Sequence, residues 1–168
     1  MEPRHQRGYL ERQPALIRGG KLPLFERLCV TPETASSDGV QDIPALLESV
    51  LHEVKCLLNT RLPVAAGWSD ESSQTVVNYG LPDFSLLSAA NPVDCQKLAA
   101  LLEIKIAAFE PRLRQVRVSF EPDPSNRSVL IGAMRGVLQV ASVSEPISFG
   151  LSKGNAGFEV ERADNASR

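Results

Sequence analysis

A carboxylate and a guanidinium stand two residues apart in the stretch Phe109-Glu110-Pro111-Arg112-Leu113. Pro111 lacks a backbone N–H and biases Glu110 away from helical dihedral angles, so this stretch is predicted to end a helix and turn the chain into a strand. Arg112 offers a planar fork of donors that suits a carboxylate or backbone carbonyls. The two charges therefore contact a partner or hold the corner rigid, unless they are simply solvated at a helix end.

The cysteines and histidines show no spacing that is typical of a reactive or metal-binding site. Cys29, Cys56 and Cys95 are odd in number and far apart, which argues against a disulfide framework or a zinc pattern. His5 lies in a polar segment and His52 on the polar side of a predicted helix, without a nucleophile or ligand partner nearby in sequence. The sequence therefore predicts no metal site, no catalytic triad, no Cys-His pair and no cofactor.

Length and composition indicate one globular domain. The 168 residues fit a single domain, and the hydrophobic fraction of 43% is sufficient for a core. The formal net charge of −2 gives no reason to expect nucleic acid binding. No apolar run approaches the roughly 20 residues that span a bilayer, and the Arg-rich beginning of the chain lacks the apolar core of a signal peptide. We therefore expect a cytoplasmic protein without direct membrane insertion.

Residues 1–41 are predicted to form a mobile tail that contains one short amphipathic helix, at about 22–29. Leu24, Phe25 and Leu28 share one face of that helix, and residues 31–41 read as a linker rich in Ser, Thr, Pro, Asp and Gly. A single amphipathic turn is not stable alone, so it must pack on the body of the protein or on a partner.

Residues 42–163 are predicted to form the folded body, which opens with two helices. The first has a continuous apolar stripe from Ile43 to Leu58, with Asp42 as its N-cap. An irregular connection follows, in which apolar side chains are expected to pack down on the core: Tyr79, Leu81 and Phe84. The second helix is predicted from about Asp94, as its cap, to Phe109.

Strand patterns fill the rest of the body. They cover 114–121, 128–140, 147–151 and 157–161, with a break at Ser144-Glu145-Pro146 and a disordered C-terminus at 164–168. Gly132 and Gly136 indicate a bulge or a close backbone approach in the long second strand. The predicted fold class is α+β, with two main helices followed by a small antiparallel β-meander.

Several short motifs of the sequence, and the order in which they follow one another, resemble the TssE family of type VI secretion baseplate subunits. These subunits are related to a wedge protein of contractile phage baseplates, and the group is often labelled lysozyme-like. The matching motifs are Leu24-Phe25-Glu26-Arg27-Leu28, Leu57-Leu58-Asn59-Thr60-Arg61, Tyr79-Gly80-Leu81-Pro82-Asp83-Phe84 and Phe109-Glu110-Pro111-Arg112-Leu113. Each motif alone is weak, but the ordered set is specific.

The resemblance implies a structural role without catalysis. It implies a place in the baseplate at the inner face of the cytoplasmic membrane, with TssF, TssG and TssK as wedge partners and TssB and TssC as sheath partners. Glu110, Pro111 and Arg112 are implied in the contact between baseplate and sheath. The amphipathic face of Leu24, Phe25 and Leu28 is expected to dock on TssF and TssG or on the body of the protein. An antiparallel meander also ends in edges that can template an added strand, which fits this role.

Two other functions compete with this one. A lysozyme-like glycoside hydrolase acting on peptidoglycan would need two carboxylates about 5–10 Å apart, and the candidates are Glu53, Asp83, Glu103 and Glu110. Glu53 and Glu103 fall on polar helix faces, however, and a muralytic enzyme would need an export signal that the sequence does not show. The third possibility is a soluble adaptor outside any secretion machine.

Overall fold

The computed structural model describes residues 43–62, 75–126, 129–140, 143–154 and 157–163. The predicted tail with Leu24, Phe25 and Leu28, the proposed cap Asp42 and the C-terminal residues 164–168 lie outside the described residues. None of the described helices is long and apolar enough to cross a membrane.

Helix α2 spans Ile43–Asn59, and its apolar stripe forms the centre of the core. Leu46, Val50, Val54 and Leu58 have no exposed surface, as expected for one face of a helix with apolar residues three and four apart. Leu51 is only half-buried, so it lies at the margin of the stripe.

Helix α3 spans Pro92–Phe109 and begins earlier than the sequence pattern predicted. Its N-cap is Asn91, whose Oδ1 accepts a hydrogen bond from the Val93 N–H at 3.0 Å, so the prediction of Asp94 as the cap is wrong. Pro92 fits inside the first turn because the N–H that it lacks has no helical partner there. Asp94 instead accepts a bond from the Ser88 N–H at 3.1 Å and steadies the preceding turn.

The connection between the helices packs down through the predicted side chains. Leu81 and Phe84 are buried, and the half-buried Tyr79 meets the Phe109 ring edge-on at a centroid distance of 5.4 Å. Its described part also holds one 3₁₀ turn, η1, at Val76–Asn78.

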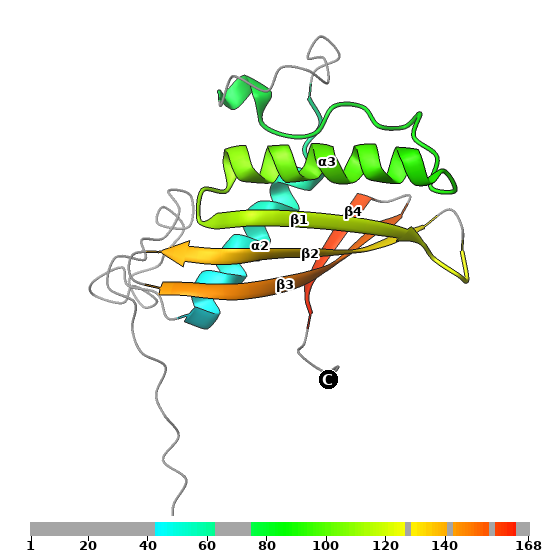
Figure 1. Cartoon of the computed structure of the whole chain (residues 1–168). Helices are drawn as coiled ribbons and strands as arrows, with labels where there is room; N and C mark the ends of the chain where they lie inside the picture. The colour runs from blue at the N-terminus through cyan, green and yellow to red at the C-terminus, as the bar shows by residue number, and fades with distance from the viewer. Residues whose placement is uncertain (1–42, 63–74, 127–128, 141–142, 155–156, 164–168) are drawn as a thin grey trace, which may run out of the picture.

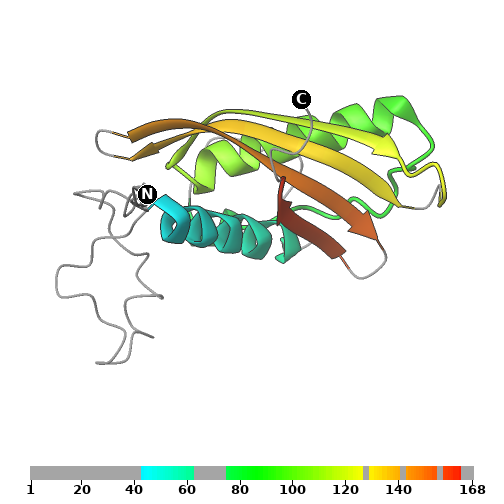
Figure 2. The ribbon, with the colours of Figure 1, turned by 90° about the horizontal axis from the view of Figure 1, so that it is seen from below.

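Four antiparallel strands follow in a meander, which confirms the predicted α+β class. The strands are β1 (Leu113–Pro122), β2 (Leu130–Val140), β3 (Val143–Gly154) and β4 (Gly157–Arg162), and they pair in the order β1-β2-β3-β4. Figure 1 shows α3 lying along β1 and α2 passing behind the strands. The view in Figure 2 shows α2 on one side of the sheet, and no described helix covers the other side.

The two glycines of β2 mark a close backbone approach, while the bulge lies in the neighbouring strand. A Cβ on Gly132 would come within 2.5 Å of the Ser119 carbonyl oxygen. The register of β1 against β2 shifts between Arg114 and Arg117, where Gln115 adopts a positive φ of 54°. The extra residue of the bulge is thus on β1, and it bends the strand at the point where it leaves the corner after α3.

The predicted break at Ser144-Glu145-Pro146 is wrong, because β3 runs through all three residues. The Ser148 carbonyl accepts a hydrogen bond from the Ala163 N–H at 3.2 Å, so the backbone groups of Ser148 point away from β2. Backbone groups alternate in direction along an antiparallel strand, and those of Pro146 therefore point the same way. The missing N–H of the proline costs no bond to β2, as is typical of a proline on a strand edge.

Candidate functional site

Glu110 and Arg112 form a bidentate ion pair across Pro111, at the corner between α3 and β1. The Arg112 Nε donates to Glu110 Oε1 at 2.8 Å and its Nη2 to Oε2 at 2.6 Å. The Arg112 backbone N–H also donates to Oε1, at 3.1 Å. Glu110 is 3% exposed, so this carboxylate is almost fully removed from water and is satisfied inside the chain.

The same guanidinium ties the corner to the first helix. Its Nη1 donates to the Ser49 hydroxyl at 3.0 Å, and Ser49 is a buried polar residue of α2. Three elements, α2, α3 and β1, thus meet at Arg112. The sequence singled out Glu110, Pro111 and Arg112 but did not indicate Ser49. A single serine in the apolar stripe of a helix is common, and its type does not reveal a partner.

Tyr79 closes one side of this corner and carries a strongly shifted phenol. Burial raises the pKa of Tyr79 to about 12, with smaller contributions from the negative charges of Glu53, Cys56 and Glu110. The hydroxyl therefore stays neutral at physiological pH, and it is not a base that could activate water.

The outer edge of β4 is closed by a side chain of α2. The Asn59 amide donates to the Phe158 carbonyl at 2.9 Å and accepts from the Phe158 N–H at 3.0 Å, so it imitates a paired residue of another strand. Val160 is the next residue of β4 whose backbone groups face away from β3, and it is only 4% exposed. This edge is therefore covered by α2, which is one way in which proteins protect a sheet edge.

The outer edge of β1 is closed along most of its length by α3 and by side chains. The Val118 N–H donates to Glu103 Oε1 of α3 at 2.8 Å, and the Val116 carbonyl accepts from the Arg117 guanidinium at 3.1 Å. The strand ends at Pro122, which has no N–H to offer.

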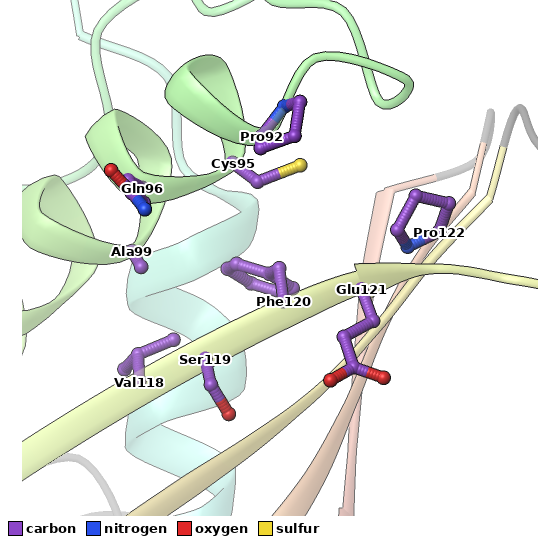
Figure 3. Close-up of a pocket in the computed structure, with 9 residues that line it drawn as sticks. All are labelled: Pro92, Cys95, Gln96, Ala99, Val118, Ser119, Phe120, Glu121 and Pro122. Atoms are coloured by element: carbon purple, nitrogen blue, oxygen red, sulfur yellow. The ribbon is translucent and has the colours of Figure 1, made fainter.

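A shallow groove of about 380 Å³ lies beside Phe120, between the start of α3 and the end of β1. Figure 3 shows its lining: Pro92, Cys95, Gln96, Ala99, Val118, Ser119, Phe120, Glu121 and Pro122. Glu121 is the single carboxylate in that lining. Burial raises the pKa of the Cys95 thiol, with the charge of Asp94 adding to the effect, so this cysteine is a poor nucleophile. The groove does not bring together the groups of a hydrolase.

The first half of β3 is the longest uncovered edge among the described strands. β4 pairs with β3 only over Phe149–Gly154, and no described strand lies beside Val143–Ile147. The residues there whose backbone groups point away from β2 are Ser144 and Pro146, and both are exposed. This segment, called here the open half-edge, presents the Ser144 N–H and the carbonyls of Ser144 and Pro146, and its backbone groups suit an added strand.

Three of the four carboxylates considered for glycoside hydrolysis, Asp83, Glu103 and Glu110, are held by structural contacts. Glu110 pairs with Arg112, and Glu103 bonds the Val118 N–H and lies 3.5 Å from Arg117. Asp83 is exposed, and hydrogen bonds from the hydroxyl and N–H of Ser85 lower its pKa. These contacts are those of turn and edge caps.

The prediction that His52 has no partner nearby in sequence is wrong, because a Cys-His contact lies on the exposed side of α2. The Cys56 Sγ is 3.6 Å from His52 Nε2, one helical turn away, and Cys56 is exposed. Positions four apart share a helix face, so the spacing itself could have indicated this pair. The described residues contain no group of three or more His, Cys, Asp or Glu side chains that could hold a metal ion.

The comparisons with known proteins identify the family. No curated protein matches the chain. The family model of the baseplate wedge protein gp25 matches residues 45–141, which is more than half of the 168 residues. The match spans all of α2 except its first two residues, and the whole of α3, β1 and β2. By this match the chain belongs to the baseplate wedge protein gp25 family, which is also the family of TssE, and so has a structural role in a contractile baseplate.

Proposed function

We propose that this protein is the type VI secretion baseplate subunit that joins the wedge to the first ring of the contractile sheath. Its wedge partners would be TssF, TssG and TssK, and its sheath partners TssB and TssC. It would act in the cytoplasm, at the inner face of the membrane. Membership of the gp25 family supports a baseplate role, and the open half-edge of β3 is the observation that carries the sheath contact.

The open half-edge supports the proposal because a strand of another chain could continue the line of β4 there. Main-chain hydrogen bonds to Ser144 and Pro146 would supply the joint. Val143 and Ile147 are partly buried against the core, so the added strand would also cover apolar surface.

Glu110, Pro111 and Arg112 would serve this contact by fixing the position of the sheet relative to both helices. Their hydrogen bonds lie within the chain, which favours a role in holding the corner over direct capture of a partner. The face of Leu24, Phe25 and Leu28 would dock on the wedge. Leu24→Asp with Leu28→Asp should then weaken co-purification with TssF and TssG while the body stays folded, and unchanged co-purification would contradict wedge docking.

The experiment that tests the sheath contact removes the outward donor of Ser144. In cells that lack this protein and carry a fluorescent sheath subunit, the wild-type gene should restore sheath assembly. Ser144→Pro should fail, because Pro cannot donate and the Ser144 N–H points away from β2. Ser144→Ala keeps the N–H and is the matched control. Normal sheaths with Ser144→Pro would reject the open half-edge, and normal sheaths in cells without the protein would reject the function itself.

A further inference from the structure

Three arginines gather on the side of the sheet that no described helix covers. Arg114 and Arg117 lie on β1 and Arg135 on β2, and all three are exposed. Their neighbours along each strand, Leu113, Val116 and Met134, are buried on the opposite, core-facing side. We call these three residues the arginine cluster.

The cluster brings like charges together. Arg117 and Arg135 are direct partners in the register of β1 and β2, and Arg114 is paired with Val137, two residues further along β2. Like charges directly opposite one another destabilise an antiparallel pair. The Arg117 side chain is 79% exposed and lies 3.5 Å from Glu103 at the strand edge, while Arg114 and Arg135 form no ion pair with any described residue. The free chain therefore carries a charge arrangement that an acidic partner would relieve.

The surroundings of the cluster suit a protein segment. Beside it, the same side of the sheet is lined by small residues, Ala133, Ser148 and Gly150, which let another backbone approach closely. Acidic residues lie at two borders of this side: Glu121 near the end of β1, and Glu159 and Glu161 on β4, where Glu161 is paired with Gly150. A long polyanion such as nucleic acid would be repelled there, whereas a short acidic segment can end before them.

We propose that the arginine cluster binds an acidic segment of a partner protein, laid across β1 and β2 so that its carboxylates pair with the three guanidinium groups. This surface is distinct from the open half-edge, and the inference does not depend on the proposed function. Arg is suited to it, because each fork can bind a carboxylate through two parallel hydrogen bonds.

The test uses the full chain and a fluorescent peptide of alternating Glu and Ser, about ten residues long, in which carboxylates repeat on one side of an extended backbone. Binding is followed by anisotropy at about 50 mM salt, where screening is weak. The Arg114→Ala, Arg135→Ala double variant should bind about tenfold more weakly than wild type. The Lys55→Ala, Lys97→Ala double variant removes the same charge from the helices and is the control, which should keep its affinity.

Two further measurements decide the interpretation. The melting temperature of the arginine double variant should not fall, because neither Arg114 nor Arg135 forms an ion pair with a described residue. A fall would show that the arginines serve the fold and would overturn the proposal. An equal loss of affinity in the lysine control would also overturn it, as would no loss in the arginine variant. Single-stranded DNA that binds more tightly than the peptide, through the same arginines, would assign the surface to nucleic acid instead.

Discussion

Arg112 holds the buried carboxylate of Glu110 through two parallel hydrogen bonds, of 2.8 and 2.6 Å, although only a proline separates the two residues. An ion pair this close in sequence fixes the backbone between its members. Because the Glu110 carboxylate is also removed from water, it depends on Arg112, and the loss of Arg112 leaves a buried charge without compensation.

Arg112→Ala is therefore expected to lower the free energy of unfolding by about 3–5 kcal/mol. Arg112→Lys should retain part of the stability, because Lys keeps the charge but loses the fork. Urea unfolding of the purified chain measures both. If Arg112→Ala unfolds like wild type, the ion pair does not stabilise the corner.

The double variant Glu110→Met, Arg112→Met separates the fold from the partner contact. Replacing both members of a buried pair by apolar side chains is often neutral or stabilising, so this variant should recover most of the stability that Arg112→Ala loses. If it folds and still fails to support sheath assembly in cells, the charges themselves contact a partner. Normal assembly would assign them to the corner alone.

Asn59→Ala should cost about 1–3 kcal/mol, since it leaves the Phe158 N–H and carbonyl without their side-chain partner. Asn59→Asp keeps the acceptor but opposes the Phe158 carbonyl with a charge, so it should rescue little. Hydrogen exchange at the Phe158 amide is the direct readout. Slow exchange that persists in Asn59→Ala would mean that another group closes this edge.

When alanine replaces a glycine of the sheet, the loss of stability should be larger where there is less space for the new Cβ. In Gly132→Ala the new atom would lie 2.5 Å from the Ser119 oxygen, and in Gly136→Ala 3.2 Å from the Arg114 oxygen. Gly150→Ala meets nothing closer than 3.9 Å and is the control. Since overpacking typically costs roughly 1–3 kcal/mol, Gly132→Ala should lose at least this much and Gly150→Ala almost nothing. Equal melting temperatures would contradict the close approach of β1 and β2.

Tyr79 should make stability depend on pH in the alkaline range. The pKa of Tyr79 is raised to about 12 in the folded chain, while an unfolded tyrosine titrates near pH 10. The folded chain therefore holds its proton longer, so the contribution is complete below about pH 10 and is lost as pH rises toward about 12. Absorbance titration should show a late tyrosinate step that Tyr79→Phe abolishes, and a single step near pH 10 in wild type would refute the shift.

The sequence predicted the main elements because their signals are local and repetitive. The stripe of α2 and the alternation of β1 come from side-chain periodicity, and both helices and all four strands were expected. Periodicity predicts burial less well at the margin of a stripe. Both Leu51 and Leu58 belong to the predicted stripe of α2, but Leu51 is half-buried and Leu58 has no exposed surface. Leu58→Ala should accordingly cost about 2–5 kcal/mol and Leu51→Ala clearly less.

The contacts that the sequence did not predict depend on direction or on long range. Asp94 and Asn91 are both good caps, and the choice between them follows from how the preceding turn is held. Pro146 predicts a break in the strand, because the sequence does not show that its nitrogen faces the open edge of the sheet and not β2. Ser49 and Asn59 meet their partners 63 and 99 residues away, and no periodicity connects such distant positions.

The Asn59 contact has a consequence for how the protein is made. Asn59 ends the first described helix, and Phe158 belongs to the last described strand, so one amide joins α2 to β4. During synthesis the helix leaves the ribosome long before its partner strand exists. This contact between α2 and β4 therefore forms only after nearly the whole described body has been synthesised.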